Sequence, residues 1–330
     1  MDILDYIVMQ IWTAARSILL SWLMLPAALL SSVATGGMLR FTELPFKGFL
    51  DRDLLPYSIA EEGALGTIHF LNTGDSDAIL LESDGHFALV DAGFYYDDID
   101  DSVVDYVKHV TGGHLDFIMG THAHLDHLGG FVNLLEQPDI AVDRAYLKPD
   151  RNDEAYDDVG GVETNLYKWI LEACGERGIE LVQENLEHRI ITLGNMELKI
   201  FNGNEEPSDP YENANSLCLL VECGGGRAFL AGDLNNLDQR ETRIAGEVGK
   251  VDLLKAGHHG LEGSTTMGLL AQLRPRTVVF TNDPIALLTM NVKWRTAWIA
   301  NSRMMATGSF EDGIAAVFGE CGMQYYEIGK

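Results

Sequence analysis

The stretch Gly120-Thr-His-Ala-His-Leu-Asp-His-Leu-Gly-Gly130 places three histidines and one aspartate within six residues. Imidazole and carboxylate groups are ligands of Zn²⁺ and similar divalent ions. A run this short cannot wrap four side chains around one ion from a single helix face. A loop can instead present His122 and His124 in one direction and Asp126 and His127 in another. The spacing therefore predicts two adjacent metal ions, roughly 3.5–4 Å apart, with a hydroxide held between them.

The alternative interpretation is a polar loop in which the histidines fall together by coincidence. The whole chain of 330 residues contains ten histidines, so three within six positions are poorly explained by chance. We therefore expect two divalent ions, with Zn²⁺ as the first choice and Mn²⁺ as the alternative.

The composition is that of an acidic globular protein, with 46% hydrophobic residues, 22% charged residues and a net charge of −27. Such a surface repels phosphate backbones, and lysines and arginines form no run, so nucleic acid is a disfavoured partner. The acidity suits a secreted protein or a small cationic ligand, although it can also serve solubility alone. The four cysteines form no CxxC pair and give no zinc-knuckle pattern.

The N-terminal region contains an uncharged apolar stretch at residues 17–35, preceded by Arg16. The small residues Ser32-Val-Ala34 offer a cleavage site, so residues 1–34 are expected to be a signal peptide or a membrane anchor. The alternative is an apolar helix packed on the domain. Export predicts a secreted or membrane-anchored, extracellular protein of bacterial type that meets the membrane only through this segment.

The remainder of the chain divides into a lead-in or linker at residues 35–64 and one hydrolase domain at residues 65–330. Segments with strand-like alternation come in clusters, separated by turn residues such as Asp84-Gly85, and helical spacing occurs on either side of them. This order predicts an α/β fold, an αββα sandwich of two mixed β-sheets flanked by helices.

Two later segments extend the metal-binding pattern. Asp233 follows an apolar strand and a glycine, where its carboxylate could bridge two cations. His258 and His259 are adjacent on a glycine-flanked turn, so one can bind a metal while the other points into the pocket. We expect His258 to be the ligand and His259 to be a catalytic proton donor or oxyanion partner, and the reverse assignment stays open.

Other polar residues are expected to lie around the ligands or to touch the substrate. Asp91 ends a strand beside the metal loop and is expected to accept a hydrogen bond from a ligand histidine; Asp77 could do the same. Asn213 and Asn215 precede a strand and could bind a metal weakly through oxygen or bind substrate. Each aspartate could equally be an ordinary turn residue.

The combined motifs resemble the metallo-β-lactamase superfamily. Leu115-Asp-Phe through Gly130, Asn213-Ala-Asn-Ser-Leu217 and Ala231-Gly-Asp-Leu234 resemble the catalytic module of teichoic-acid phosphorylcholine esterases, which are secreted di-zinc phosphodiesterases. The His-His-Gly260 segment is more similar to the hydrolase domain attached to bacterial DNA-uptake channels. The resemblance implies the metallo-β-lactamase fold and a set of metal-binding residues, namely His122, His124, Asp126, His127, Asp233 and His258.

These observations predict a dinuclear metal-dependent hydrolase of the phosphodiesterase or phosphorylcholine-esterase type, with Asp126 and His259 as catalytic residues. The expected substrate is a small phosphoester or a cell-wall polymer. One alternative is a competence-type, metal-dependent nuclease acting on single-stranded DNA. Another is a non-catalytic, metal-dependent binding module at the cell surface.

Overall fold

The computed structural model describes residues 50–57, 63–95, 97–149, 162–203, 212–284, Leu287, 290–320 and 322–329. The expected signal or anchor segment, residues 1–34, lies outside the described residues. None of the helices in the described part of the chain is both long enough and apolar enough to cross a membrane.

The described strands form two mixed sheets. The first has nine strands, in the spatial order β1 (Leu55–Pro56), β16 (Gly322–Ile328), β15 (Gly313–Gly319), β2 (Gly66–Leu71), β3 (Ala78–Ser83), β4 (His86–Ala92), β5 (His114–Gly120), β6 (Ala141–Leu147) and β7 (Glu180–Val182). The second has seven, in the order β14 (Arg303–Ala306), β13 (Thr277–Phe280), β12 (Leu253–Lys255), β11 (Gly226–Leu230), β10 (Cys218–Cys223), β9 (Met196–Phe201) and β8 (Ile190–Leu193).

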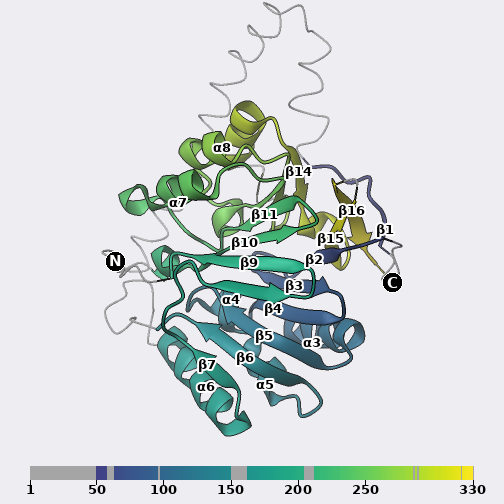
Figure 1. The fold of residues 1–330 in the computed structure, drawn as a ribbon, viewed down its shortest axis with the longest axis vertical. Helices are drawn as coiled ribbons and strands as arrows, with labels where there is room; N and C mark the ends of the chain where they lie inside the picture. Colours follow the sequence, from purple (N-terminus) through teal and green to yellow (C-terminus); the bar gives the residue numbers. More distant parts are fainter. Residues whose placement is uncertain are drawn as a thin grey trace, which may run out of the picture.

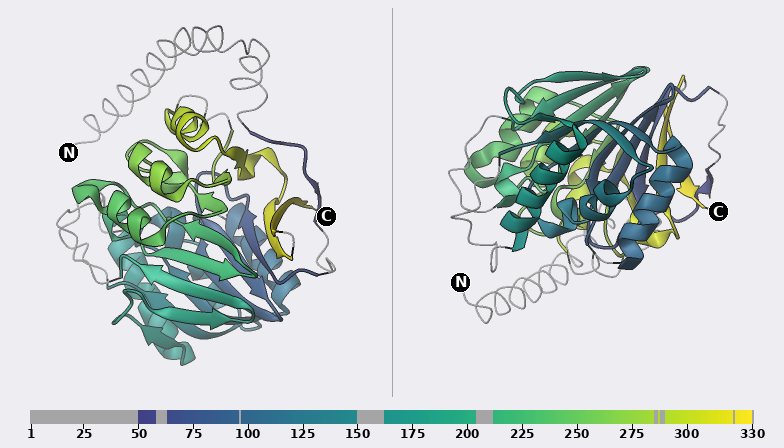
Figure 2. Two further views of the ribbon diagram at one scale, coloured as in Figure 1. Left: turned by 45° about the horizontal axis from the view of Figure 1, so that its top comes forward. Right: turned by 90° about the horizontal axis from the view of Figure 1, so that it is seen from below.

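Helices cover the outer face of each sheet (Figures 1 and 2). The first sheet is covered by α3 (Asp97–Thr111), α5 (Phe131–Glu136) and α6 (Val162–Arg177), and the second by α7 (Arg240–Val248), α8 (Met267–Leu273) and α9 (Val292–Arg295). The short helix α4 (Leu125–Leu128) follows β5. The predicted αββα sandwich of two mixed sheets is thus confirmed.

The period-two alternation of the strands explains why the layers stack in this order. In β3, Ile79 and Leu81 lie in the core between the two sheets, whereas Ala78 and Leu80 lie in the core beneath the helices of the first sheet. Successive side chains of a strand point to opposite faces of the sheet. A strand with an uninterrupted run of apolar residues is therefore buried on both faces. Such strands need helices outside and a second sheet inside.

The lead-in region is partly joined to the fold. Leu55 and Pro56 pair in parallel with β16, and the Asp51 amide donates a hydrogen bond to the Met304 carbonyl at 2.8 Å. Residues 50–57 therefore lie against the C-terminal strands.

The topology gathers the polar motifs at one edge of the sandwich. Strands β4, β5 and β6 run parallel in the first sheet, and β11 to β14 run parallel in the second. Carboxyl ends of parallel neighbours meet at the same edge, so the loops that follow β5, β11 and β12 converge there. These loops carry the run from His122 to His127, Asp233, and the His258–His259 pair.

Candidate metal centre

His122 and His124 form one pair of converging nitrogen atoms. His122 is buried, and its Nε2 lies 3.0 Å from His124 Nδ1. Burial, together with the neighbouring His127 and His124 rings, holds the pKa of His122 well below its ordinary value. A neutral imidazole is the form that binds a metal ion, so this pair can supply two nitrogen ligands.

A second group of donor atoms surrounds the Asp233 carboxylate. Asp233 Oδ2 lies 3.2 Å from His127 Nε2 and 3.3 Å from His259 Nε2. Asp126 Oδ2 lies 3.2 Å from His259 Nε2 and 3.7 Å from His127 Nε2. Two imidazole nitrogens and two carboxylate oxygens thus face one another, which is a donor set suited to a divalent transition metal.

The two groups are neighbours. The ring centroids of His122 and His127 are 4.1 Å apart, and those of His127 and His259 are 5.1 Å apart. The Asp233 carboxylate also lies near His258, whose Nε2 approaches Oδ2 at 3.8 Å, and its charge acts on the buried His122 ring. The geometry therefore provides two adjoining donor groups, with the Asp233 carboxylate in the second.

Several of these atoms are buried without a hydrogen-bond partner in the described part of the chain. They are His127 Nε2, His259 Nε2 and both carboxylate oxygens of Asp233. Unsatisfied buried polar atoms are rare, and each calls for an explanation such as a bound ion. Three of them, His127 Nε2, His259 Nε2 and Asp233 Oδ2, face one another, so the residues present fit a metal centre.

Asp91 holds the His127 ring in place from behind. Its Oδ2 accepts a hydrogen bond from His127 Nδ1 at 2.7 Å, and its Oδ1 accepts one from the Thr121 amide at 2.8 Å. A donor at Nδ1 leaves Nε2 with its lone pair toward the donor group. Asp91 has φ of 57°, a left-handed conformation uncommon outside glycine, asparagine and aspartate, which turns the chain away from the end of β4.

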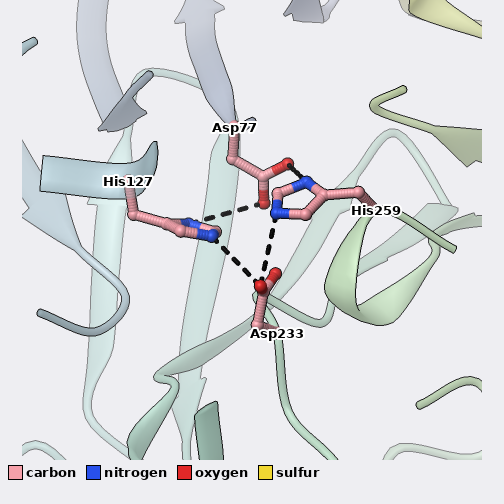
Figure 3. Close-up of side chains that lie close together, drawn as sticks. All are labelled: Asp77, His127, Asp233 and His259. Atoms are coloured by element: carbon pink, nitrogen blue, oxygen red, sulfur yellow. Dashed lines mark ion pairs between the residues drawn. The ribbon is translucent and has the colours of Figure 1, made fainter. Parts of the chain in front are cut away.

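Asp77 has the matching position behind His259. Its Oδ1 lies 3.2 Å from His259 Nδ1 and accepts a hydrogen bond from the Thr281 hydroxyl at 2.6 Å. Asp77, His127, Asp233 and His259 are all buried, and each offers one ligand atom within 4.8 Å of the others (Figure 3). Asp77 already bonds His259 through the ring nitrogen farther from Asp233, so we interpret it as a support of that ring.

The charges of this cluster depend strongly on one another. Burial alone raises the pKa of Asp233, but the nearby His259 and His127 rings hold that pKa well below its usual range. Conversely, burial lowers the pKa of His127 and His259, but Asp233 and other carboxylates raise both far above the ordinary value. The carboxylates thus favour positive charge at each ring. A proton on the ring nitrogen or a metal ion bound to it can supply that charge, so the two would compete.

The adjacent histidines of the Gly257–Gly260 turn have different surroundings. Both have positive φ, 50° at His258 and 51° at His259, so their side chains leave the turn in different directions. His259 is buried within the donor group, whereas the side chain of His258 is 29% exposed and its Nε2 lies 3.5 Å from Asn213 Nδ2. The geometry therefore favours His259 as a ligand and puts His258 beside Asn213.

Two site residues had no role assigned from the sequence. Lys255, fully buried at the end of β12, forms ion pairs with Asp77 and Asp233. Glu212 accepts hydrogen bonds from the Ala123 amide at 2.9 Å and from Asn215 Nδ2 at 2.8 Å. Asn215 thus contacts a residue that supports the backbone of the loop. Lys255 lies three residues before His258 in the sequence, but a lysine is ordinarily a surface residue, so nothing in the sequence signalled its role.

Parts of the chain are similar to a known protein family and to two bacterial proteins. The model of the family "Metallo-beta-lactamase superfamily" matches residues 71–172. ComE operon protein 3 of Bacillus subtilis (strain 168) is 26% identical over 168 residues, which cover 50% of this chain and 20% of that protein. Recombination protein 2 of Haemophilus influenzae is 35% identical over 71 residues, which cover 22% of this chain and 9% of that protein.

Among solved structures, the metallo-β-lactamase fold protein YhfI from Bacillus subtilis aligns with a TM-score of 0.51 and 11% identity. The alignment covers 76% of this chain and 98% of that one, which supports the shared fold. The matched regions span a fifth or less of the curated relatives. The superfamily resemblance indicated by the histidine-rich run is confirmed.

Proposed function

We propose that this chain, which is similar to the metallo-β-lactamase superfamily over residues 71–172, is a dinuclear metal-dependent hydrolase acting on phosphodiesters. The observation that carries the proposal is the pair of adjoining donor groups, which include a buried Asp233 carboxylate that faces two imidazole nitrogens without a hydrogen bond. Two divalent ions, when bound, would lower the pKa of a water molecule toward neutrality and offset the charge of the phosphoryl oxygens.

Two sets of residues from the donor groups would hold the two ions. Asp126, His127 and His259 would hold one ion, and His122 with His124 would hold the other. We propose that Asp233 serves both, because its Oδ2 faces His127 and His259 while its charge also acts on the neighbouring His122 ring. The expectation that His258 is a ligand and His259 a proton donor is therefore reversed in this proposal.

His258 is suited to the proton-donor role. Its side chain is partly exposed, so it can reach a substrate, and its Nε2 lies 3.8 Å from Asp233 Oδ2. Burial lowers the pKa of His258, so its ring is mostly neutral near pH 7 and would first take a proton from the attacking water and then give one to the leaving alkoxide. Asn213, 3.5 Å from the same nitrogen, would orient the ring.

We propose a small phosphoester, or a cell-wall phosphodiester whose phosphates are offset by cationic groups such as choline, as the substrate that fits the acidic composition. A chain with a net charge of −27 repels a long polyanion, but a compact or choline-bearing ester carries little negative charge. We keep residues 65–330 as the hydrolase domain and residues 1–34 as a signal or anchor, which would place the enzyme outside the cell.

A second candidate function is cleavage of single-stranded DNA. It is favoured by the 35% identity to a protein named Recombination protein 2. The similarity of the His-His-Gly260 segment to hydrolase domains of DNA-uptake channels points the same way. The strong net negative charge opposes it, because affinity for DNA depends on neutralising phosphates.

The test is hydrolysis of p-nitrophenyl phosphorylcholine, bis-p-nitrophenyl phosphate and single-stranded DNA by the purified chain supplied with Zn²⁺ or Mn²⁺. We expect turnover of at least one chromogenic ester and a loss of about 100-fold or more in His124→Ala. His188→Ala is the matched control, because His188 pairs with Glu187 and Glu247 outside the site. Stoichiometric metal without turnover of any ester would instead indicate a binding module.

A further inference from the structure

Lys255 is a fully buried lysine at the carboxyl end of β12, directly before the turn that carries His258 and His259. Three oxygen atoms surround its Nζ. It donates a hydrogen bond to the Gly232 carbonyl at 3.0 Å, forms an ion pair with Asp77 Oδ2, and lies 3.5 Å from Asp233 Oδ1. An ammonium group has three donors, so each oxygen can face one of them.

The two oxygens of Asp233 face different partners. Oδ1 faces Lys255, whereas Oδ2 faces the Nε2 atoms of His127 and His259. A carboxylate held at one oxygen cannot rotate freely about its terminal bond, so the contact with Lys255 keeps Oδ2 directed at the donor groups. The adjoining Gly232 carbonyl ties the same ammonium to the backbone just before Asp233.

Asp77 is held in the same way. Its Oδ2 pairs with Lys255, and its Oδ1 faces His259 Nδ1 at 3.2 Å. The ammonium therefore acts on His259 through Asp77 and on the shared carboxylate directly. Taking a cation out of water is costly unless it is paired and hydrogen-bonded. An apolar side chain at this position would leave the buried carboxylates of Asp77 and Asp233 without the cation that faces them, so the charge of Lys255 itself has a role.

We propose that Lys255 is a positioning residue of the metal centre, which orients Asp233 directly and His259 through Asp77. The proposal rests on the proposed function, since it assumes that these residues hold metal ions. Lys255 does not itself bind an ion or touch the substrate. It is the group that sets the direction of the shared carboxylate.

The test compares the full chain with Lys255→Met and Lys255→Gln, using Co²⁺ as the probe. Affinity is measured by competition with a chromogenic chelator, the number of ions by elemental analysis, and ligand geometry by the visible absorption of bound Co²⁺. We expect Lys255→Met to bind at least one ion about 10- to 100-fold more weakly, with an altered Co²⁺ spectrum. Lys255→Gln keeps a donor without the charge, and should lie between Lys255→Met and the wild type.

Lys293→Met is the control for loss of a buried lysine. Lys293 is 6% exposed in α9, and its Nζ lies 5.7 Å from the centroid of the Trp294 ring. The Lys293→Met variant should keep the wild-type affinity for Co²⁺ and the wild-type absorption spectrum of the bound ion. If Lys255→Met does not fold, Lys255→Gln alone decides the question.

Two results would overturn the inference, and they have different meanings. Wild-type affinity and spectrum in both Lys255 variants, even with a lower melting temperature, would reduce Lys255 to a structural residue and leave the proposed function intact. A wild-type chain that binds no Co²⁺ at all would remove the proposed function, and the inference with it.

Discussion

Asp91 contributes to the site through the histidine that it holds. It is fully buried, and its carboxylate accepts hydrogen bonds from His127 Nδ1, the Thr121 amide and the Thr121 hydroxyl. Such an aspartate fixes both the tautomer and the direction of a ligand ring. The role of Asp91 can be tested apart from that of the metal ligands. Asp91 contacts Nδ1 of His127, whereas Asp233 faces Nε2 of the same ring.

We predict that Asp91→Asn weakens metal binding about 10- to 100-fold. The amide would place a donor against groups that already donate, so the His127 ring would lose its fixed orientation. Asp116→Asn is the matched control, since Asp116 also accepts from a backbone amide, that of Phe87, and from a histidine, His86. Chelator competition should separate the two variants; equal affinities would argue against this role of Asp91.

At the scale of elements, two glutamates from different parts of the fold accept hydrogen bonds from the backbone of the loop His122–His127. Glu212, in the 3₁₀ turn Glu212–Asn215, accepts from the Ala123 amide, and Glu163, in the first turn of α6, accepts from the Leu125 amide at 3.2 Å. The backbone is thus held on both sides of His124. This arrangement connects the second sheet and a helix of the first sheet to one loop.

The pair Gly129-Gly130 lets the loop pass close to β4. A Cβ atom added at Gly130 would lie 2.1 Å from the Ala92 carbonyl oxygen, which is backbone and cannot swing away. We predict that Gly130→Ala lowers the free energy of unfolding by about 1–3 kcal/mol, because the packing must be displaced.

The matched comparison is Gly175→Ala, within α6, where an added Cβ meets nothing within 4 Å. This change should raise the free energy of unfolding by about 0.4–1 kcal/mol, since alanine favours the helix. Urea denaturation measures both values. Similar effects in the two variants would show that the close approach at Gly130 does not matter.

For the whole molecule, the layer order could be predicted from sequence but the finer site could not. Strand β3 begins with four consecutive apolar residues, Ala78 to Leu81, and this pattern requires cover on both faces. The run from His122 to His127 likewise marks a metal loop by its spacing alone. The roles of His258 and His259 depend on two consecutive left-handed residues, and the burial of Lys255 depends on contacts with distant loops.

Whole-molecule stability should depend on metal. Removing the ions with EDTA would leave the carboxylates of Asp126 and Asp233 without their divalent partners. We predict that saturation at 100 times the dissociation constant stabilises the fold by about 2.7 kcal/mol per ion. Calorimetry of the stripped and reloaded chain measures this difference, and an unchanged melting temperature would contradict it.

The central claim is that two metal ions bind side by side and share Asp233. Anomalous diffraction from crystals grown with Zn²⁺ or Mn²⁺ tests this claim most directly. The account predicts two peaks in contact with the Asp233 carboxylate, one bound by His127 and His259 and the other by His122 and His124. A single peak, a peak bound by His258 in place of His259, or no peak at all would contradict it.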